Sequence, residues 1–201
     1  MLNTKISCLA ALLLAFAGQA NAALTVDTGT PDGSGFALLL DANDWLAGQV
    51  TFTNSVQVNA INAYLDDMGN GPGTFTLALY GDNSVKHAPG NLLSSVSTMF
   101  TNTGWNEAAN LNWSVGPGTY WIAIEGQNPF SGGFTGVAPV GAPSPLAHTA
   151  FNDGSGYKSA DGLSFGLRVD TVAAVPEPAT SAMLLTGLGL LGAVSVRRKV
   201  A

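Results

Sequence analysis

Hydrophobic and polar residues alternate along the middle of the chain. Between Thr74 and Tyr80, the residues Phe75, Leu77 and Leu79 occupy every second position, with threonine or alanine between them. Such a period of two is typical of a β-strand with one face in a core and the other toward water. The same period recurs in three further stretches, Gln49–Val58, Thr119–Glu125 and Leu163–Val169.

Turn-forming residues separate these stretches at short intervals. Glycine, proline and asparagine gather at 69–73, 81–83, 89–91, 116–118 and 132–133. No long helical period occurs between Ala23 and Val175. We therefore predict an all-β fold, an antiparallel β-sandwich or jelly roll of roughly eight to ten strands. The stretch Phe130–Pro145, rich in glycine, proline and alanine, is predicted to be a long surface loop or an irregular edge.

One turn predicts an aromatic pair. If Gly116–Gly118 is a three-residue hairpin turn, then Trp113 faces Trp121 across two neighbouring strands. Tyr120 and Ile122 then point the other way, into the core. The two indoles form a candidate sugar-binding surface if they are exposed. The alternative is that they pack under a loop or against the second layer.

The N-terminal end has the features of a secretory signal peptide. Lys5 is followed by the apolar run Ile6–Ala17, and Ala20 and Ala22 flank a small-x-small cleavage site. We expect signal peptidase to remove residues 1–22, so that the mature chain begins at Ala23. The apolar run is too short for the alternative, a transmembrane helix, and it is followed at once by the cleavage site.

The C-terminal end has a different order of features. Pro176 and Pro178 prevent a helix from starting before them. Residues 179–196 carry no charge, and as a helix they would span roughly 27 Å, close to the hydrocarbon thickness of a membrane. Three basic residues follow and are predicted to stop translocation at the cytoplasmic side: Arg197, Arg198 and Lys199.

The C-terminal end resembles the PEP-CTERM sorting signal of Gram-negative bacteria. The resemblance rests on three features in this order: the triplet Pro176, Glu177 and Pro178, the apolar helix and the basic end. The resemblance implies processing near the triplet by an exosortase, after transient anchoring in the inner membrane. It also implies export to the surface or the extracellular matrix of exopolysaccharide-producing cells. The predicted organisation is therefore a signal peptide at 1–22, a β-sandwich domain at 23–172 and a sorting and anchor segment at 173–201.

The charge of the body narrows the classes of partner. Between Ala23 and Val175, three basic and twelve acidic side chains give a net charge of −9. Nucleic-acid binding is excluded, because it requires a cluster of lysine and arginine. The only cysteine, Cys8, lies in the predicted signal peptide, so the mature body has no thiol for a disulfide, a nucleophile or a metal site.

No catalytic motif is present. His87 and His148 are isolated in the sequence and are interpreted as surface-loop histidines, and no G-x-S-x-G elbow occurs. A paired-carboxylate glycosidase stays formally open, with the acids Glu107, Glu125, Asp66 and Asp67. We predict no cofactor. A structural calcium ion is the open alternative, if acids from the front of the body (Asp27, Asp32, Asp41 and Asp44) meet acids from the back (Asp153, Asp161 or Asp170).

Three hypotheses of function follow. The preferred one is a non-enzymatic surface or matrix protein, which meets signal peptidase, exosortase and, transiently, the membrane. The second is a carbohydrate-binding module that holds extracellular polysaccharide through Trp113 and Trp121. The third is an enzyme that acts on that polysaccharide through two carboxylates.

Overall fold

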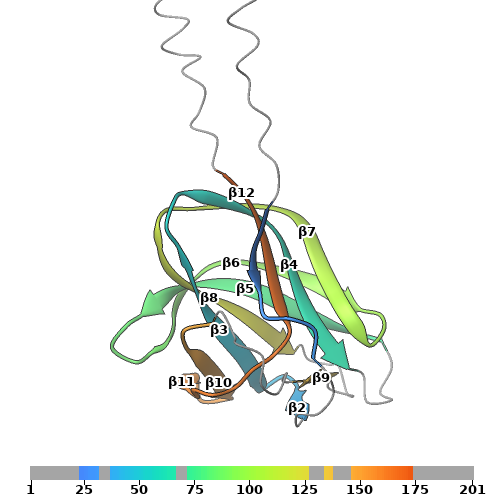
Figure 1. The fold of residues 1–201 in the computed structure, drawn as a ribbon. Coiled ribbons are helices and arrows are strands. Elements are labelled where there is room, and N and C mark those ends of the chain that lie inside the picture. The colour runs from blue at the N-terminus through green and yellow to red at the C-terminus, as the bar shows by residue number, and fades with distance from the viewer. Residues whose placement is uncertain (1–22, 32–36, 67–71, 127–133, 138–145, 174–201) are drawn as a thin grey trace, which may run out of the picture.

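The computed structural model describes residues 23–31, 37–66, 72–126, 134–137 and 146–173. These residues form twelve strands and no helix (Figure 1). The strands make two six-stranded antiparallel sheets that pack face to face. The predicted all-β sandwich is confirmed, although the structure has more strands than the roughly eight to ten expected, because several are only three to five residues long.

Sheet A is built around the long strand β4. Its order is β1 (Ala23–Asp27), β12 (Leu167–Ala173), β4 (Val56–Asp66), β9 (Phe134–Val137) and β2 (Ala37–Leu40), and β7 (Gly104–Val115) also pairs with β4. The strand β12 pairs with residues 56–63 of β4, and β9 pairs with the next part of β4, at Leu65 and Asp66. Because β7 pairs along the same length of β4 as β12, it lies on the opposite edge of that strand.

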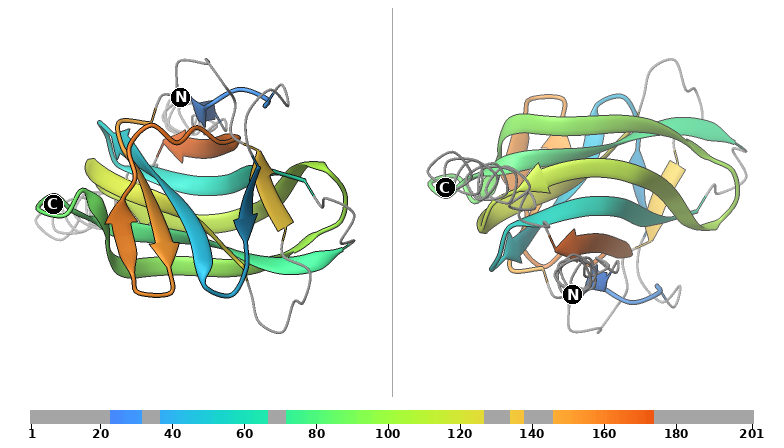
Figure 2. Two further views of the ribbon diagram at one scale, coloured as in Figure 1. Left: turned by 90° about the horizontal axis from the view of Figure 1, so that it is seen from below. Right: turned by 90° about the horizontal axis from the view of Figure 1, so that it is seen from above.

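Sheet B has β3 and β8 at its centre. Its order is β11 (Tyr157–Ser159), β10 (Thr149–Asp153), β3 (Asp44–Phe52), β8 (Gly118–Gly126), β5 (Gly73–Asn83) and β6 (Ala88–Phe100). The sheet is strongly curved. In the left panel of Figure 2, β10 and β11 (orange) run across the direction of β5 and β6 (green).

The main core lies between the sheets and comes from the alternation in the sequence. Phe75, Leu77 and Leu79 of β5 are buried, as predicted, and Ile122 and Ile124 of β8 lie beside them. Sheet A contributes the facing side chains Val58, Ile61, Ala63, Leu65, Leu167 and Val169. Full burial of each large aliphatic or aromatic side chain stabilises the fold by about 1.5–3 kcal/mol.

Two predicted segments differ in detail. The stretch Leu163–Val169 becomes a strand only at Leu167, yet Phe165 before it is buried as its place in the alternation requires. The predicted loop Phe130–Pro145 contains β9, which pairs with β2. The rest of that loop lies outside the described residues.

The predicted hairpin at Gly116–Gly118 is wrong. The strand before it, β7, belongs to sheet A, and the strand after it, β8, belongs to sheet B, so this turn carries the chain from one sheet to the other. Trp113 is paired with Val58, and Trp121 with Gln49 and Tyr80, so the two indoles do not face each other. A short glycine-rich turn can join strands of one sheet or of two, and the local sequence does not distinguish these cases.

Of the two predicted targeting segments, 1–22 lies outside the described residues, and so does 173–201 except for Ala173, which ends β12. The two segments include Ala20 and Ala22, the Pro176–Glu177–Pro178 triplet and the basic residues Arg197, Arg198 and Lys199. Within the part of the chain that the structure describes, no helix has the length and apolar character needed to cross a membrane.

Candidate functional site

The centre of the outer face of sheet B is buried, as the inner face is. Ala150, Ala47, Ala123 and Ala78 stand in register on four neighbouring strands and form one row across the sheet. All four are fully buried. We call this row the alanine floor. Because a methyl group is the whole side chain at each position, large rings can lie close to the backbone above it.

Aromatic side chains cover the alanine floor. Trp121 of β8 is fully buried there, and Tyr80 and Tyr157 pack against the same cluster. The rings of Tyr80 and Tyr157 meet edge to face with their centroids 5.6 Å apart, and the ring of Trp45 lies 6.1 Å from Tyr157. Tyr157 belongs to β11 and Tyr80 to β5. In a flat sheet these strands would be about 19 Å apart, so the contact depends on the curvature of sheet B.

Two carboxylates accept hydrogen bonds from this aromatic layer. Glu125 Oε1 accepts from the hydroxyl of Tyr80 at 2.6 Å and from the hydroxyl of Tyr157 at 2.9 Å. Asp82 Oδ1 accepts from Trp121 Nε1 at 2.7 Å and from Gln49 Nε2 at 3.0 Å. The ion pairs found among the described residues involve other acids, so here neutral donors stabilise the two carboxylates.

The surroundings of Glu125 hold both tyrosines in their neutral form. Burial raises the pKa of Tyr80 well above its ordinary value near 10, and the hydrogen bond to Glu125 and the charge of that carboxylate raise it further. Burial also raises the pKa of Tyr157, and the negative charge of Glu125 adds to this effect. The phenols therefore act as hydrogen-bond donors over the whole physiological pH range.

A close backbone approach positions Trp45. A Cβ atom on Gly126 would lie 2.2 Å from the carbonyl oxygen of Asp41, so only glycine lets the segment before β3 lie against the end of β8. The same carbonyl oxygen accepts a hydrogen bond from Trp45 Nε1 at 3.1 Å. The orientation of this indole beside Tyr157 is thus tied to the glycine that follows Glu125.

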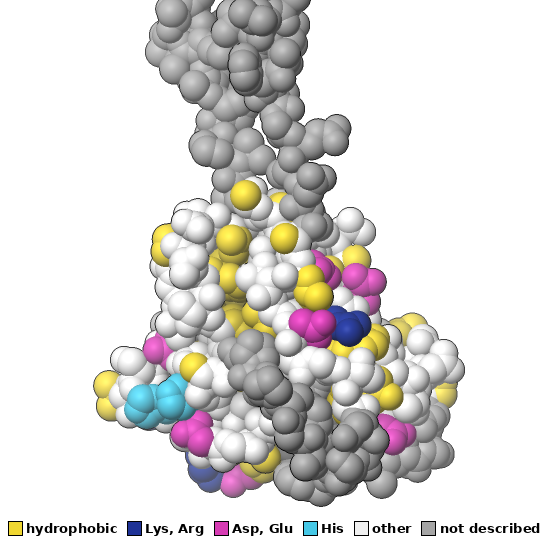
Figure 3. Space-filling model, viewed as in Figure 1, with side chains coloured by type: hydrophobic (Ala, Val, Ile, Leu, Met, Phe, Trp, Pro, Cys, Tyr) yellow, Lys and Arg dark blue, Asp and Glu magenta, His cyan; other side chains and the backbone are white. Residues whose placement is uncertain are grey.

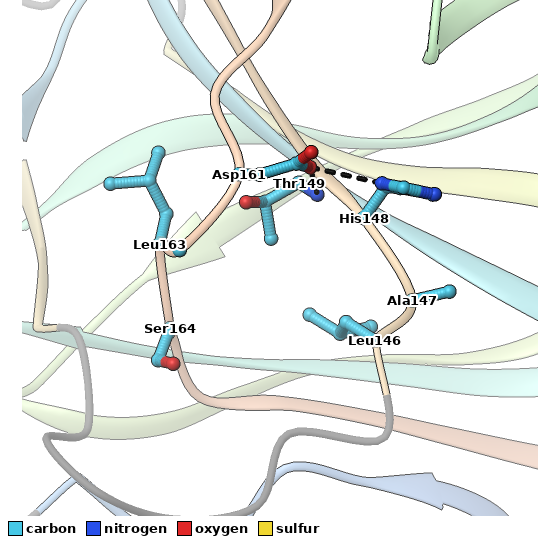
Figure 4. A pocket seen from close by; sticks show the side chains of 8 residues that line it. Leu146, Ala147, His148, Thr149, Asp161, Leu163 and Ser164 are labelled. Atoms are coloured by element: carbon cyan, nitrogen blue, oxygen red, sulfur yellow. Dashed lines mark hydrogen bonds and ion pairs between the residues drawn. The ribbon is translucent and has the colours of Figure 1, made fainter.

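A small pocket lies near the edge of sheet B. It has a volume of about 130 Å³ and is lined by Leu146, Ala147, His148, Thr149, Asp161, Gly162, Leu163 and Ser164 (Figure 4). His148 Nδ1 lies 3.1 Å from Asp161 Oδ1, and this hydrogen bond is the main cause that lowers the pKa of Asp161. The ring of His87 lies 4.8 Å from the ring of His148. The two histidines that are isolated in the sequence therefore meet in the fold.

The acids considered for calcium are divided among several places. Asp44 of β3 lies directly opposite Asp153 of β10, so acids from the front and the back of the body do meet. Burial and the charges of Asp41 and Asp153 raise the pKa of Asp44. Asp27 instead pairs with Arg168, and Asp161 with His148. Across the described ranges, no three His, Cys, Asp or Glu side chains are placed to hold a metal ion, and Asp32 lies outside them.

The outer face of sheet A carries a second aromatic group. The guanidinium of Arg168 lies 3.9 Å from the centre of the Trp105 ring, and Tyr64 meets that ring edge to face at 5.6 Å. Trp105 Nε1 donates to Thr30 Oγ1 at 3.2 Å, and Arg168 Nε pairs with Asp27 at 3.1 Å. In Figure 3, basic, acidic and hydrophobic side chains lie next to one another on this side of the molecule. These contacts fasten the first described segment to sheet A.

The structure separates the residues predicted to bind sugar or to act as a catalytic pair. Trp121 is fully buried and offers no ring surface to a sugar, and Trp113 is half-buried against the main core. Glu107 is exposed on β7 of sheet A, whereas Glu125 lies on the outer face of sheet B. Asp66 accepts a hydrogen bond from Thr103 at the end of β4, and Asp67 lies outside the described residues. Glu107 and Glu125 therefore cannot flank one glycosidic bond.

The aromatic layer could have been recognised from one signal in the sequence. In a strand with one wet face, every second residue is polar, but around Ile122 and Ile124 the intervening residues are Trp121 and Ala123. Apolar residues at both odd and even positions indicate a strand that is buried on both faces. The partners of this layer, Tyr157 above all, come from distant segments and give no such local signal.

Comparison with known proteins identifies the tail and the fold. Residues 174–199 match the model of the PEP-CTERM protein-sorting motif. The chain thus carries a PEP-CTERM sorting motif, which marks it as an exosortase substrate. No curated protein matches the chain.

The sandwich is similar to part of a solved structure. That structure contains the cysteine protease and lectin-like domains of Cwp84, a surface layer associated protein of Clostridium difficile. The TM-score is 0.52 at 12% sequence identity, over 67% of this chain and 33% of that chain. The present chain thus spans about a third of the solved chain's length, and so low an identity shows a shared fold alone.

The tyrosine–carboxylate contacts predict a loss of stability at alkaline pH. Both tyrosines have a higher pKa in the folded than in the unfolded state, so their contribution is complete below pH 10 and is lost as the pH rises above it. The free energy of unfolding, measured with urea at a series of pH values, should fall above pH 10 by up to about 1.4 kcal/mol per pH unit for each tyrosine. The double variant Tyr80→Phe/Tyr157→Phe should lose most of this slope. An unchanged slope in that variant would contradict the assignment.

Proposed function

We propose that this protein is an exported cell-surface or extracellular-matrix protein whose β-sandwich body is non-enzymatic. The observation that carries the proposal is the PEP-CTERM motif at residues 174–199, because it directs a chain to an exosortase. In this account the membrane and the exosortase are transient partners. The body remains outside the cell, on the surface or in an exopolysaccharide-rich matrix.

The place where the fold ends supports processing of the tail. The strand β12 ends at Ala173, three residues before Pro176. Ala23 pairs with Thr171, so the first and last described residues lie at the same end of sheet A (Figure 1). A cut near the triplet therefore falls beyond every described strand and leaves the sandwich complete.

The anchored form keeps the body close to the membrane. Five residues separate Ala173 from the predicted helix at 179–196, and a fully extended chain of that length reaches about 17 Å. While the tail is uncut, the sandwich would lie within that distance of the lipid surface. Release by the exosortase removes this constraint.

A non-enzymatic body is supported by what its acids contact. Glu125 and Asp82 accept hydrogen bonds from tyrosine, tryptophan and glutamine side chains. Asp27 and Asp153 form ion pairs with Arg168 and Lys158. Each of these contacts fastens one strand to another or closes a turn, which is a structural use of a carboxylate.

Intact mass spectrometry of surface material tests the proposal. We expect a chain that begins at Ala23 and lacks residues 196–201, because signal peptidase and exosortase remove the two ends. A deletion of the Arg197–Lys199 stop should leave the chain unprocessed or misplaced. A mature surface protein that still carries residues 196–201 would contradict sorting by cleavage.

A second candidate function is carbohydrate binding at the aromatic layer of sheet B. Trp45, Tyr80 and Tyr157 are each partly exposed and lie next to one another around Glu125. Flat aromatic surfaces beside a hydrogen-bond acceptor suit the apolar face and the hydroxyls of a sugar ring. The net charge of −9 in the body favours a neutral polysaccharide over an anionic one. The likeness to a structure that contains a lectin-like domain supports the same idea.

Two matched tryptophan variants test this candidate. Trp45 and Trp105 are both half-buried indoles with one hydrogen bond each, but they lie on the outer faces of opposite sheets. On an array of neutral glycans, Trp45→Ala should weaken binding about tenfold, or about 1.4 kcal/mol, and Trp105→Ala should leave it unchanged. Absence of binding by the wild-type protein, or equal loss in both variants, would count against the candidate.

A further inference from the structure

His87 and His148 form a pair of imidazoles on the surface, although they lie far apart in the sequence. Their ring centres are 4.8 Å apart, and the ring planes are tilted by 40°. Figure 3 shows the two side chains (cyan) next to each other on one face of the molecule. His87 is exposed and His148 is half-buried, so an ion from solution can reach the pair.

The backbone around both histidines is fixed by its neighbours. The carbonyl oxygen of His148, directly before β10, accepts a hydrogen bond from the backbone N–H of Gln49 in β3 at 2.9 Å. His87 ends the turn between β5 and β6 in a left-handed conformation with φ of 46°, and Ala88 after it is fully buried. Few residues other than glycine adopt this conformation, because it brings Cβ close to the backbone. Ordered segments therefore present the two imidazoles to each other.

Asp161 determines which nitrogen of His148 carries the hydrogen. Asp161 Oδ1 lies 3.1 Å from His148 Nδ1 and also accepts from the backbone N–H of Thr149 at 3.4 Å. Because an ionised carboxylate can only accept, Nδ1 of the neutral ring carries the hydrogen and Nε2 keeps its lone pair. In Figure 4 the second ring nitrogen of His148 points away from Asp161. A carboxylate placed behind a histidine in this way commonly supports a metal-binding imidazole.

We propose that His87 and His148 bind one divalent transition-metal ion through one ring nitrogen each, with Asp161 as the positioning residue behind His148. With metal–nitrogen bonds of about 2.1 Å and angles from square-planar to tetrahedral, two imidazoles on one ion have ring centres about 4.5–5.2 Å apart. The observed separation of 4.8 Å lies inside this range. Imidazole nitrogen suits copper, nickel and zinc, whereas calcium and magnesium prefer oxygen ligands.

Two imidazoles leave the other coordination positions of the ion open. Among the described residues, no group of three His, Cys, Asp or Glu side chains is placed to hold an ion, so water fills these positions. The site is therefore exchangeable, unlike a closed structural zinc site, and copper(II) should bind most tightly of the three metals. The ion would link the turn after β5 to the segment before β10, which have β3 and β8 between them in sheet B. This inference goes beyond the proposed function and does not depend on it.

Binding of Cu²⁺ to the full chain, without a histidine tag, tests the site. Cys8→Ser removes the only thiol, and the chain has no histidines besides the pair. Isothermal titration should give one ion per chain, and electron spin echo spectroscopy should count two imidazoles on it. His87→Asn and His148→Asn should each lower the affinity at least about tenfold and leave one imidazole. Asparagine suits both positions, because it tolerates the left-handed conformation and its amide can donate to Asp161.

Two matched carboxylate variants test the role of Asp161. Asp161→Asn should weaken Cu²⁺ binding roughly tenfold and change the echo signal of the remote ring nitrogen of His148, because an amide accepts a weaker hydrogen bond than a carboxylate. Asp153→Asn removes an equal charge from a carboxylate of similar exposure, 46% against 58%, and should change neither.

The parent chain alone can overturn the proposal, so the test does not depend on how well a variant folds. Absence of Cu²⁺ binding by the parent chain, or fewer than two imidazoles on the bound ion, overturns it. Unchanged affinity in either histidine variant overturns it as well. Equal losses in Asp161→Asn and Asp153→Asn would reduce the carboxylate to a general charge effect and overturn its positioning role.

Discussion

Burial of both faces at the centre of sheet B is the constraint on which the rest of the structure depends. In β8 the side chains of Ile122 and Ile124 enter the core between the sheets, while Trp121 and Ala123 are equally buried on the opposite face. A sheet with two apolar faces needs a second cover, and sheet B supplies it by curving until Tyr157 meets Tyr80. The alanine floor makes this curvature possible, because larger side chains would hold the rings away from the backbone.

The polar groups of this second core follow from the same constraint. A tyrosine or tryptophan that is buried needs an acceptor for its O–H or N–H, because an unsatisfied polar group in the interior is costly. Glu125 accepts hydrogen bonds from both tyrosine hydroxyls, and Asp82 accepts one from the indole of Trp121. The resulting surface is a partly exposed aromatic strip above a filled interior.

The sequence predicts a good part of this fold, since a period of two shows which residues share a face. Phe75, Leu77 and Leu79 are buried as their spacing requires, and the tail is recognisable from the order of Pro176–Pro178, apolar run and basic end. Alternation does not show which strand is the neighbour. The pairing of β3 with β10 and the change of sheet at Gly116–Gly118 depend on distant segments. The predicted Trp113–Trp121 pair is wrong because the residues around the turn do not show that the chain changes sheet there.

Hydrogen exchange at the indole of Trp121 measures the second core most directly. Its Nε1–H is fully buried and donates to Asp82, whereas the indoles of Trp45, Trp105 and Trp113 are all partly exposed. In an NMR exchange experiment, with the signal assigned from Trp121→Phe, this N–H should exchange slowest of the four indoles, at a rate set by opening of the fold. Exchange as fast as that of an exposed indole would show that the outer face of sheet B is open, and would contradict the account.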